Sequence, residues 1–163
     1  MLAGLPLEAI DLCYHQRVHL NPGARTLVRT MKAHGARCVL VSGGFRSFTT
    51  RVAAVAGFDA DYANALIDDG DRLLGTVEEP ILGREAKLAT LEREAAALGI
   101  GLVDALAIGD GANDLAMIGA AGLGVAYRAK PIVAAEADAR IDHADLTALL
   151  YFQGYRAGEF VQK

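Results

Sequence analysis

Residues 105–114 read Ala-Leu-Ala-Ile-Gly-Asp-Gly-Ala-Asn-Asp, an apolar run followed by glycines and acids. The apolar run predicts a buried strand over residues 105–108. In open α/β sheets, ligands bind beyond the carboxyl ends of the strands, which is where Asp110 falls. Gly109 and Gly111 let the backbone turn sharply around that acid. The stretch therefore predicts the ligand-binding edge of an α/β sheet.

The acids of this turn are candidates for holding a metal. Hard cations such as Mg²⁺ prefer carboxylate oxygens, so Asp110 is a candidate metal ligand. Asn113 and Asp114 begin a helix predicted over 113–120, where their side chains can cap free N–H groups and still face a ligand. An acidic turn that only caps a helix is the alternative. The complete string at the end of an apolar strand favours the metal site.

The rest of the chain alternates short apolar runs with helical patterns, which predicts an α/β fold. Asn21 and Pro22 are typical of a helix start, so they are expected to open the second helix. The expected strands are 37–41, 105–108, 122–126 and 139–141, and the expected helices are 6–17, 21–34, 45–56, 83–98, 113–120 and 131–137. Residues 62–67 and 73–78 flank an acidic turn and predict a β-hairpin.

Two further segments can bind phosphate. Residues 42–44, Ser-Gly-Gly, are predicted as the turn after strand 37–41, and a hydroxyl with backbone N–H groups can hold a phosphate. Lys87 lies near the start of the helix over 83–98 and can extend a positive charge toward a phosphate. Arg84 is a neighbouring alternative. Each signal alone favours a plain turn or a solvated lysine. The combination of these segments with the acidic turn favours phosphate binding.

A serine-glycine turn after one strand, a lysine before another and an acidic cluster after that second strand resemble three motifs of the haloacid dehalogenase-like phosphatases. Within that group the chain is similar to the phosphoserine phosphatases over essentially its whole length. The similarity rests on residues 41–45, 79–81, 109–115, 122–127, 129–131 and 149–155. It implies a Rossmann-like parallel sheet with helices on both faces and a β-hairpin insertion.

The resemblance also implies roles for individual residues in binding substrate. Ser42 would bind the phosphate through its hydroxyl, and Gly43 through its backbone N–H. Lys87 would hold the phosphate charge, and Asn113 would contact the substrate. These assignments describe a pocket for a small phosphorylated metabolite.

The resemblance implies a metal site and a reaction as well. Asp110 would ligate Mg²⁺, and Asp114 would support it, so that Asp110, Asp114 and Lys87 form the catalytic set present here. In the family the phosphoryl group passes to an aspartate and is then hydrolysed by water. The implied reaction is hydrolysis of O-phosphoserine to serine and phosphate, the last step of serine synthesis.

The aspartate nucleophile of the family belongs to an Asp-x-Asp-x-Thr segment, and these 163 residues contain none. The nearest match, residues 59–61, is interpreted as an acidic loop before the hairpin. The family places the nucleophile's strand at the centre of the sheet, so we expect the fold to lack that strand. Residues 1–20 resemble the last helix of an otherwise missing cap domain, and residues 21–163 an incomplete core. We therefore expect a fragment, a late-start gene model or a chain needing a complementing N-terminal segment.

Composition narrows the partners. The net charge is −4, with scattered basic residues, which argues against nucleic acid. No apolar run reaches the roughly 18 residues that span a bilayer. Residues 1–12 lack the basic start of a secretory signal, and two cysteines are too few for a disulfide framework. A cytoplasmic location is therefore expected.

Two other functions stay open. One keeps the chemistry with another small phosphorylated metabolite, either hydrolysed or used for phosphotransfer. The other is a non-catalytic phosphate- and metal-binding domain. The aromatic tail over 151–155 is expected to pack or to form a homodimer contact.

Overall fold

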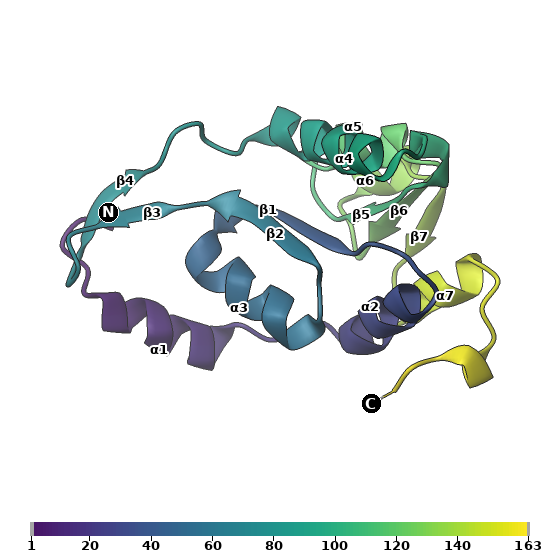
Figure 1. Cartoon of the computed structure of the whole chain (residues 1–163), viewed down its shortest axis with the longest axis horizontal. Helices are drawn as coiled ribbons and strands as arrows, with labels where there is room; N and C mark the ends of the chain where they lie inside the picture. The colour runs from purple at the N-terminus through teal and green to yellow at the C-terminus, as the bar shows by residue number, and fades with distance from the viewer. Residues whose placement is uncertain (1, 163) are drawn as a thin grey trace. The chain divides into compact units, whose positions relative to one another are not determined.

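The computed structural model describes residues 2–162. Their contacts define two compact units: unit 1 holds the residues up to Ile81 together with those from Leu146 on, and unit 2 spans Leu82–Asp145. Parallel strands with packed helices occur in each unit (Figure 1). The predicted α/β class is therefore confirmed.

The sheet of unit 1 has two parallel strands, β1 (Val39–Phe45) and β2 (Ala60–Asn64). The helix α3 (Arg46–Ala56) connects them and packs on both. It ends at Gly57, whose φ of +96° is the left-handed conformation that glycine adopts without strain. The unit of strand, helix and strand places Ser42 near the carboxyl end of β1.

Two helices complete the core of unit 1, α2 (Ala24–Ala33) and the short α7 (Ala148–Phe152). The helix α2 packs against α3 and α7 and buries Val28 and Thr30. The Thr30 hydroxyl accepts a hydrogen bond from the backbone N–H of Val161 at 2.9 Å, which fastens the C-terminal tail. The predicted start of α2 at Asn21 was early, because a left-handed glycine, Gly23, holds the N-cap position.

The N-terminal helix α1 (Leu7–Arg17) lies where the sequence predicted it. The guanidinium of Arg51, on α3, pairs with Asp11 and lies 5.1 Å from the ring centre of Tyr14. The antiparallel strands β3 (Leu66–Asp68) and β4 (Leu73–Val77) form a hairpin, but the first predicted arm, 62–67, was wrong in its first half because residues 62–64 belong to β2. Backbone bonds from residues 4–7 extend the hairpin on one side.

Unit 2 holds a parallel sheet in the order β5 (Leu106–Gly109), β6 (Leu123–Tyr127), β7 (Ala139–Ile141). Its helices are α4 (Arg84–Leu98), α5 (Leu115–Ala120) and α6 (Pro131–Glu136). The helices α5 and α6 pack on the sheet, and α4 packs against α5 (Figure 1). Their core is the cluster of Ile118, Ala126 and Val133. The short 3₁₀ helices are η1 (Leu102–Asp104) in unit 2 and η2 (Ala157–Glu159) in unit 1.

Two local predictions were wrong. Residues 42–44 do not form a turn, because β1 continues through them to Phe45 with a register irregularity after Val41. The predicted acidic loop at 59–61 is mostly strand, because Ala60 and Asp61 belong to β2. The Asp61 carboxylate is half-buried and accepts hydrogen bonds from two threonine hydroxyls of α3, Thr49 at 2.7 Å and Thr50 at 3.1 Å. These bonds compensate for the water that the carboxylate loses. Within residues 2–162, no helix is both long and apolar enough to cross a membrane.

Candidate functional site

The turn after β5 is organised around the side chain of Asp114. This residue holds the N-cap position of α5 and is only 3% exposed. One carboxylate oxygen, Oδ2, accepts hydrogen bonds from the backbone N–H groups of Asp110 at 3.1 Å and Gly111 at 3.0 Å. The carboxylate therefore points back into the turn and fixes its backbone, where the sequence predicted a cap on the following helix.

The other Asp114 oxygen, Oδ1, is paired with the ammonium group of Lys87. Lys87 lies in the first turn of α4 and is 8% exposed. Most lysine side chains are solvated at the surface, but this one is buried. Burying two opposite charges together avoids the large cost of burying either alone. An ammonium carries three donors, and Asp114 is the partner of one of them. Sequence reasoning selected both residues, and the structure brings them together.

Gly109 makes this packing possible. A Cβ added to it would collide with the Cβ and carboxylate of Asp114. Only glycine fits here, because the turn must pass directly over the buried carboxylate.

Asp110 is placed differently from Asp114, because its side chain is exposed. Its backbone is fixed at both ends: the N–H donates to Asp114, and the C=O accepts from the N–H of Lys130 at 3.1 Å. Within the described part of the chain, no hydrogen bond or ion pair uses its carboxylate. An exposed carboxylate on a fixed backbone fits one ligand of Mg²⁺, which takes one or two protein carboxylates and keeps several waters.

The other exposed polar side chain of this turn belongs to Asn113. Asn113 is exposed, and its side-chain oxygen lies where a Cβ on Gly111 would be. Among residues 2–162 there is no group of three or more His, Cys, Asp or Glu side chains that could hold a metal. In unit 2, the candidate site thus consists of an exposed acid on a rigid turn, with a buried ion pair beneath it.

The other candidate residues lie in unit 1, at the end of β1. Ser42 is half-buried, and Gly43 and Gly44 are exposed. The N–H of Gly44 donates to the Ser42 hydroxyl oxygen at 3.0 Å. A hydroxyl that accepts there keeps its own proton for another acceptor. The predicted phosphate-binding groups are therefore on an accessible strand end.

Sequence reasoning missed one residue at this end of β1. Asn64, the last residue of β2, is 7% exposed, and its side-chain N–H donates to the C=O of Gly43 at 2.9 Å. A buried amide needs such partners. Asn64 was predicted to lie inside a hairpin arm. Its contact with the Gly43 carbonyl arises from the parallel pairing of β2 with β1, which was not predicted.

A protein-family model described as haloacid dehalogenase-like hydrolase matches residues 1–119. The chain belongs to this family. The match covers α1, the end of β1, Lys87 and the whole turn from Gly109 to Asp114.

This family member is similar to phosphoserine phosphatases. It is 46% identical to the one from Streptomyces coelicolor over 155 residues, which is 94% of this chain and 37% of that protein. It is 37% identical to the one from Methanocaldococcus jannaschii over 152 residues, 93% of this chain and 72% of that protein. The chain spans less than half the length of the first three curated relatives it matches.

The fold agrees with solved members of the family. A structure described as a phospho-aspartyl intermediate analogue of phosphoserine phosphatase superposes with a TM-score of 0.86 at 37% identity. That superposition covers 93% of this chain and 72% of the other.

The acids at residues 59–61, the nearest match to Asp-x-Asp-x-Thr in these residues, have structural partners. Asp59 is paired with Lys32 at 2.7 Å and accepts from the backbone N–H of Cys38 at 2.8 Å. Burial would raise the pKa of Asp59, but these two hydrogen bonds outweigh it and lower the pKa below its usual 3.8. Asp61 is engaged by α3, as described above. Both acids hold β2 in place.

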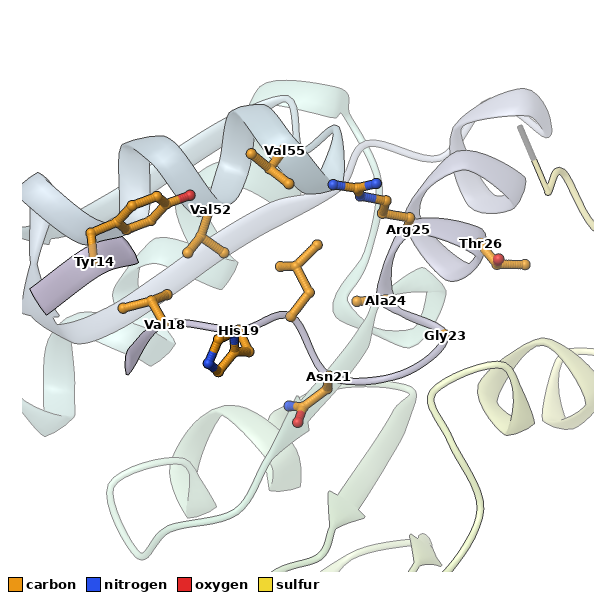
Figure 2. A pocket seen from close by; sticks show the side chains of 11 residues that line it. Tyr14, Val18, His19, Asn21, Gly23, Ala24, Arg25, Thr26, Val52 and Val55 are labelled. Atoms are coloured by element: carbon orange, nitrogen blue, oxygen red, sulfur yellow. The ribbon is translucent and has the colours of Figure 1, made fainter. Parts of the chain in front are cut away.

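Unit 1 also contains a cavity of about 490 Å³. It is bounded by α1, the segment leading into α2, and α3, with Val18, Val52 and Val55 forming much of its apolar wall (Figure 2). None of the predicted site residues lines it.

Proposed function

We propose that this chain carries the phosphate- and metal-binding part of a phosphatase that hydrolyses O-phosphoserine to serine and phosphate. The observation that carries the proposal is the turn after β5, in which the buried Lys87–Asp114 pair fixes the backbone of an exposed acid, Asp110. The similarity to phosphoserine phosphatases supports the substrate. As the last step of serine synthesis, the reaction would take place in the cytoplasm.

The candidate residues supply groups that the proposed reaction needs. The Ser42 hydroxyl and the Gly43 N–H donate to phosphate oxygens, and Asn113 contacts the substrate. The ammonium group of Lys87, held by Asp114, supplies positive charge. Donors fixed before the reaction stabilise charge on the phosphoryl oxygens without reorganising during it.

Asp110 would hold Mg²⁺, with Asp114 supporting the turn from below. Bound there, Mg²⁺ would neutralise negative charge on the phosphoryl oxygens. The protein's own contribution is the orientation of Asp110, whose backbone N–H and C=O are both engaged.

The nucleophile of the reaction would be an aspartate outside these residues, since residues 1–163 contain no Asp-x-Asp-x-Thr. The similar structure that is described as a phospho-aspartyl intermediate analogue supports this chemistry. Among the described residues β1 pairs with β2 alone, and β5 pairs with β6 alone. A complementing segment can add a strand to such an edge. In this proposal residues 1–20 belong to a cap domain and 21–163 to the core.

The test is Asp110→Asn in a longer protein that includes the Asp-x-Asp-x-Thr segment. Turnover of O-phosphoserine with Mg²⁺ should fall by orders of magnitude, because the amide keeps the shape of the side chain but removes the anionic ligand. Asp71→Asn, which changes an exposed acid in the hairpin turn, is the matched control and should retain turnover. Near-normal activity of the Asp110 variant would overturn the assignment.

A non-catalytic phosphate- and metal-binding domain is the second candidate, and the lack of an Asp-x-Asp-x-Thr segment in residues 1–163 favours it. Assaying the 163-residue chain with Mg²⁺ distinguishes the two. Robust turnover would exclude a purely binding role. A panel of small phosphorylated metabolites, tested on the longer protein, would separate O-phosphoserine from other substrates.

A further inference from the structure

The end of β1 poses a positioning problem, because its two glycines are exposed and have no side chains to hold them. The peptide that joins Gly43 to Gly44 is nevertheless fixed at both of its polar groups. Its C=O accepts from the Asn64 amide at 2.9 Å, and its N–H donates to the Ser42 hydroxyl oxygen at 3.0 Å. The peptide plane is thus determined by two side chains.

Asn64 is well placed for this contact. It is the last residue of β2, it is 7% exposed, and it lies opposite Phe45 in the parallel register. A buried amide that loses its partner retains the cost of desolvation without the compensating bond. The amide therefore holds the Gly43 carbonyl strongly, although the bond itself is neutral.

The consequence for Ser42 follows from the chemistry of a hydroxyl, which has one proton to donate and two lone pairs to accept. Because the Gly44 N–H occupies a lone pair, the oxygen is oriented and its proton points elsewhere. Turning the Gly43–Gly44 peptide would remove that N–H and let the hydroxyl rotate. The chain of contacts runs from Asn64 through the peptide to Ser42.

We propose that Asn64 is a positioning residue of the phosphate-binding strand end. It fixes the Gly43–Gly44 peptide, and through it the donor direction of Ser42. This inference rests on the proposed phosphate-binding role of Ser42 and adds a residue that acts without touching the substrate.

The first experiment needs no substitution. In the isotope-labelled 163-residue protein, a scalar coupling across the hydrogen bond should link the Asn64 side-chain nitrogen to the Gly43 carbonyl carbon. The Gly44 amide should also exchange with solvent more slowly than an exposed glycine N–H. Absence of the coupling together with fast exchange would overturn the inference.

The second experiment uses Asn64→Asp, which keeps the shape and removes the donor. The Gly44 amide should then exchange roughly tenfold faster, as expected for the loss of about one hydrogen bond. Ser42→Ala should have the same effect on that amide. The control is Gln153→Glu, which removes another amide-to-carbonyl bond in unit 1, to Leu149 at 2.9 Å, and should leave Gly44 unchanged.

Orthophosphate then separates positioning from structure. Titrated with Mg²⁺, it should shift the amide signals of residues 42–44, and Asn64→Leu, which removes the donor without adding a charge, should weaken its binding roughly fivefold to tenfold while the chain stays folded. Equal phosphate affinity and equal Gly44 exchange in the Asn64 variant would overturn the positioning role. If phosphate shifts none of these signals in the wild type, the proposed function itself fails.

Discussion

The strand ends of β1 and β5 both contain glycines but are stabilised by opposite means. At β5 the support is a buried ion pair, with the side chains of Lys87 and Asp114 10% and 4% exposed. At β1 the support is neutral, an amide on Gly43 and a hydroxyl on Gly44. The first strand end depends on charges that water cannot screen, and the second on hydrogen bonds at its surface.

The difference predicts where each strand end is sensitive. A buried charge left without its partner is among the most costly defects in a protein. A neutral hydrogen bond contributes about 1 kcal/mol net. Substitutions at the β5 turn should therefore act on stability first, and substitutions at the end of β1 should act mainly on ligand binding.

The largest effect is expected for Asp114→Ala. It leaves the Lys87 ammonium buried and removes the acceptor for two backbone N–H groups, so the free energy of unfolding should fall by about 3–5 kcal/mol. Urea unfolding followed by circular dichroism measures the loss.

The matched control removes both charges at once. The double variant Lys87→Met with Asp114→Leu should lose less stability than Asp114→Ala, because no unpaired charge remains. If the double variant is the less stable of the two, the pair does not act as a coupled unit. The contrast with the neutral support at β1 would then be wrong.

The next largest effect compares two glycines at corresponding places. Gly109→Ala drives a methyl group into the buried Asp114 side chain and should cost about 1–3 kcal/mol. Gly44→Ala places its methyl group 3.2 Å from the Ser42 hydroxyl oxygen, on the surface, and should change stability by about 0.5 kcal/mol at most.

Phosphate binding should distinguish the Gly44 variant from a purely structural change. The crowded Ser42 hydroxyl in Gly44→Ala must shift, so orthophosphate affinity at residues 42–44 should fall although stability hardly changes. Thermal unfolding and amide chemical shifts measure the two quantities. Equal loss of stability in both variants would remove the distinction between the strand ends.

Much of this arrangement could be predicted from the sequence. The turn after β5 was located correctly, because an apolar strand followed by Gly-Asp-Gly has a strong local pattern. Helix ends at Gly57 and Gly99 were also correct, since both glycines adopt the left-handed conformation that ends a helix. These features depend on neighbours in sequence.

The misses depend on distant residues. Residues 42–44 were predicted as a turn because serine and glycine are turn formers, but β1 continues through them between Val41 and Phe45, which pair with β2 on either side. Asn64 and Gly43 are 21 positions apart, and Lys87 and Asp114 are 27 apart. No local pattern specifies which side chains such pairs bring together. The pairing of Asp61 with Thr49 was missed for the same reason.

A smaller effect is expected for the exposed counterpart of the buried pair. Lys32 and Asp59 lie 2.7 Å apart beside β1, with side chains 38% and 25% exposed. Lys32→Met should cost about 0.2–1 kcal/mol, far less than Asp114→Ala. Because the pKa of folded Asp59 is below its usual 3.8, this contribution is present above that value and is lost as the pH falls through the folded pKa.

Unfolding of wild type and Lys32→Met at neutral pH and in acid measures this contribution. The two curves should converge in acid, where Asp59 is protonated in both proteins. A difference that persists unchanged in acid would show that Lys32 stabilises the chain by packing, or through its bond to the Gly57 carbonyl, instead of through the charge.

The smallest effect is expected for Cys38, the residue that precedes β1. Burial and the nearby Asp59 carboxylate raise the pKa of the Cys38 thiol from 9.0 to about 11, while Cys13 is exposed. Since the thiolate is the reactive form, iodoacetamide at about pH 8 should alkylate Cys13 first. Below pH 9.0 the Cys38 thiol is neutral in both the folded and the unfolded chain, so it leaves the free energy of unfolding unchanged. As the pH rises from 9.0 toward 11, the unfolded chain loses this proton first, and the folded chain therefore becomes less stable relative to it.

Asp59→Asn sharpens this test, because it removes the second of the two causes and keeps the shape of the side chain. Cys38 should then react a few times faster, whereas the rate at Cys13 stays constant and serves as the internal control. Mass spectrometry of timed samples resolves the two sites. Cys38 reacting as fast as Cys13 in the wild type would mean that the start of β1 opens readily.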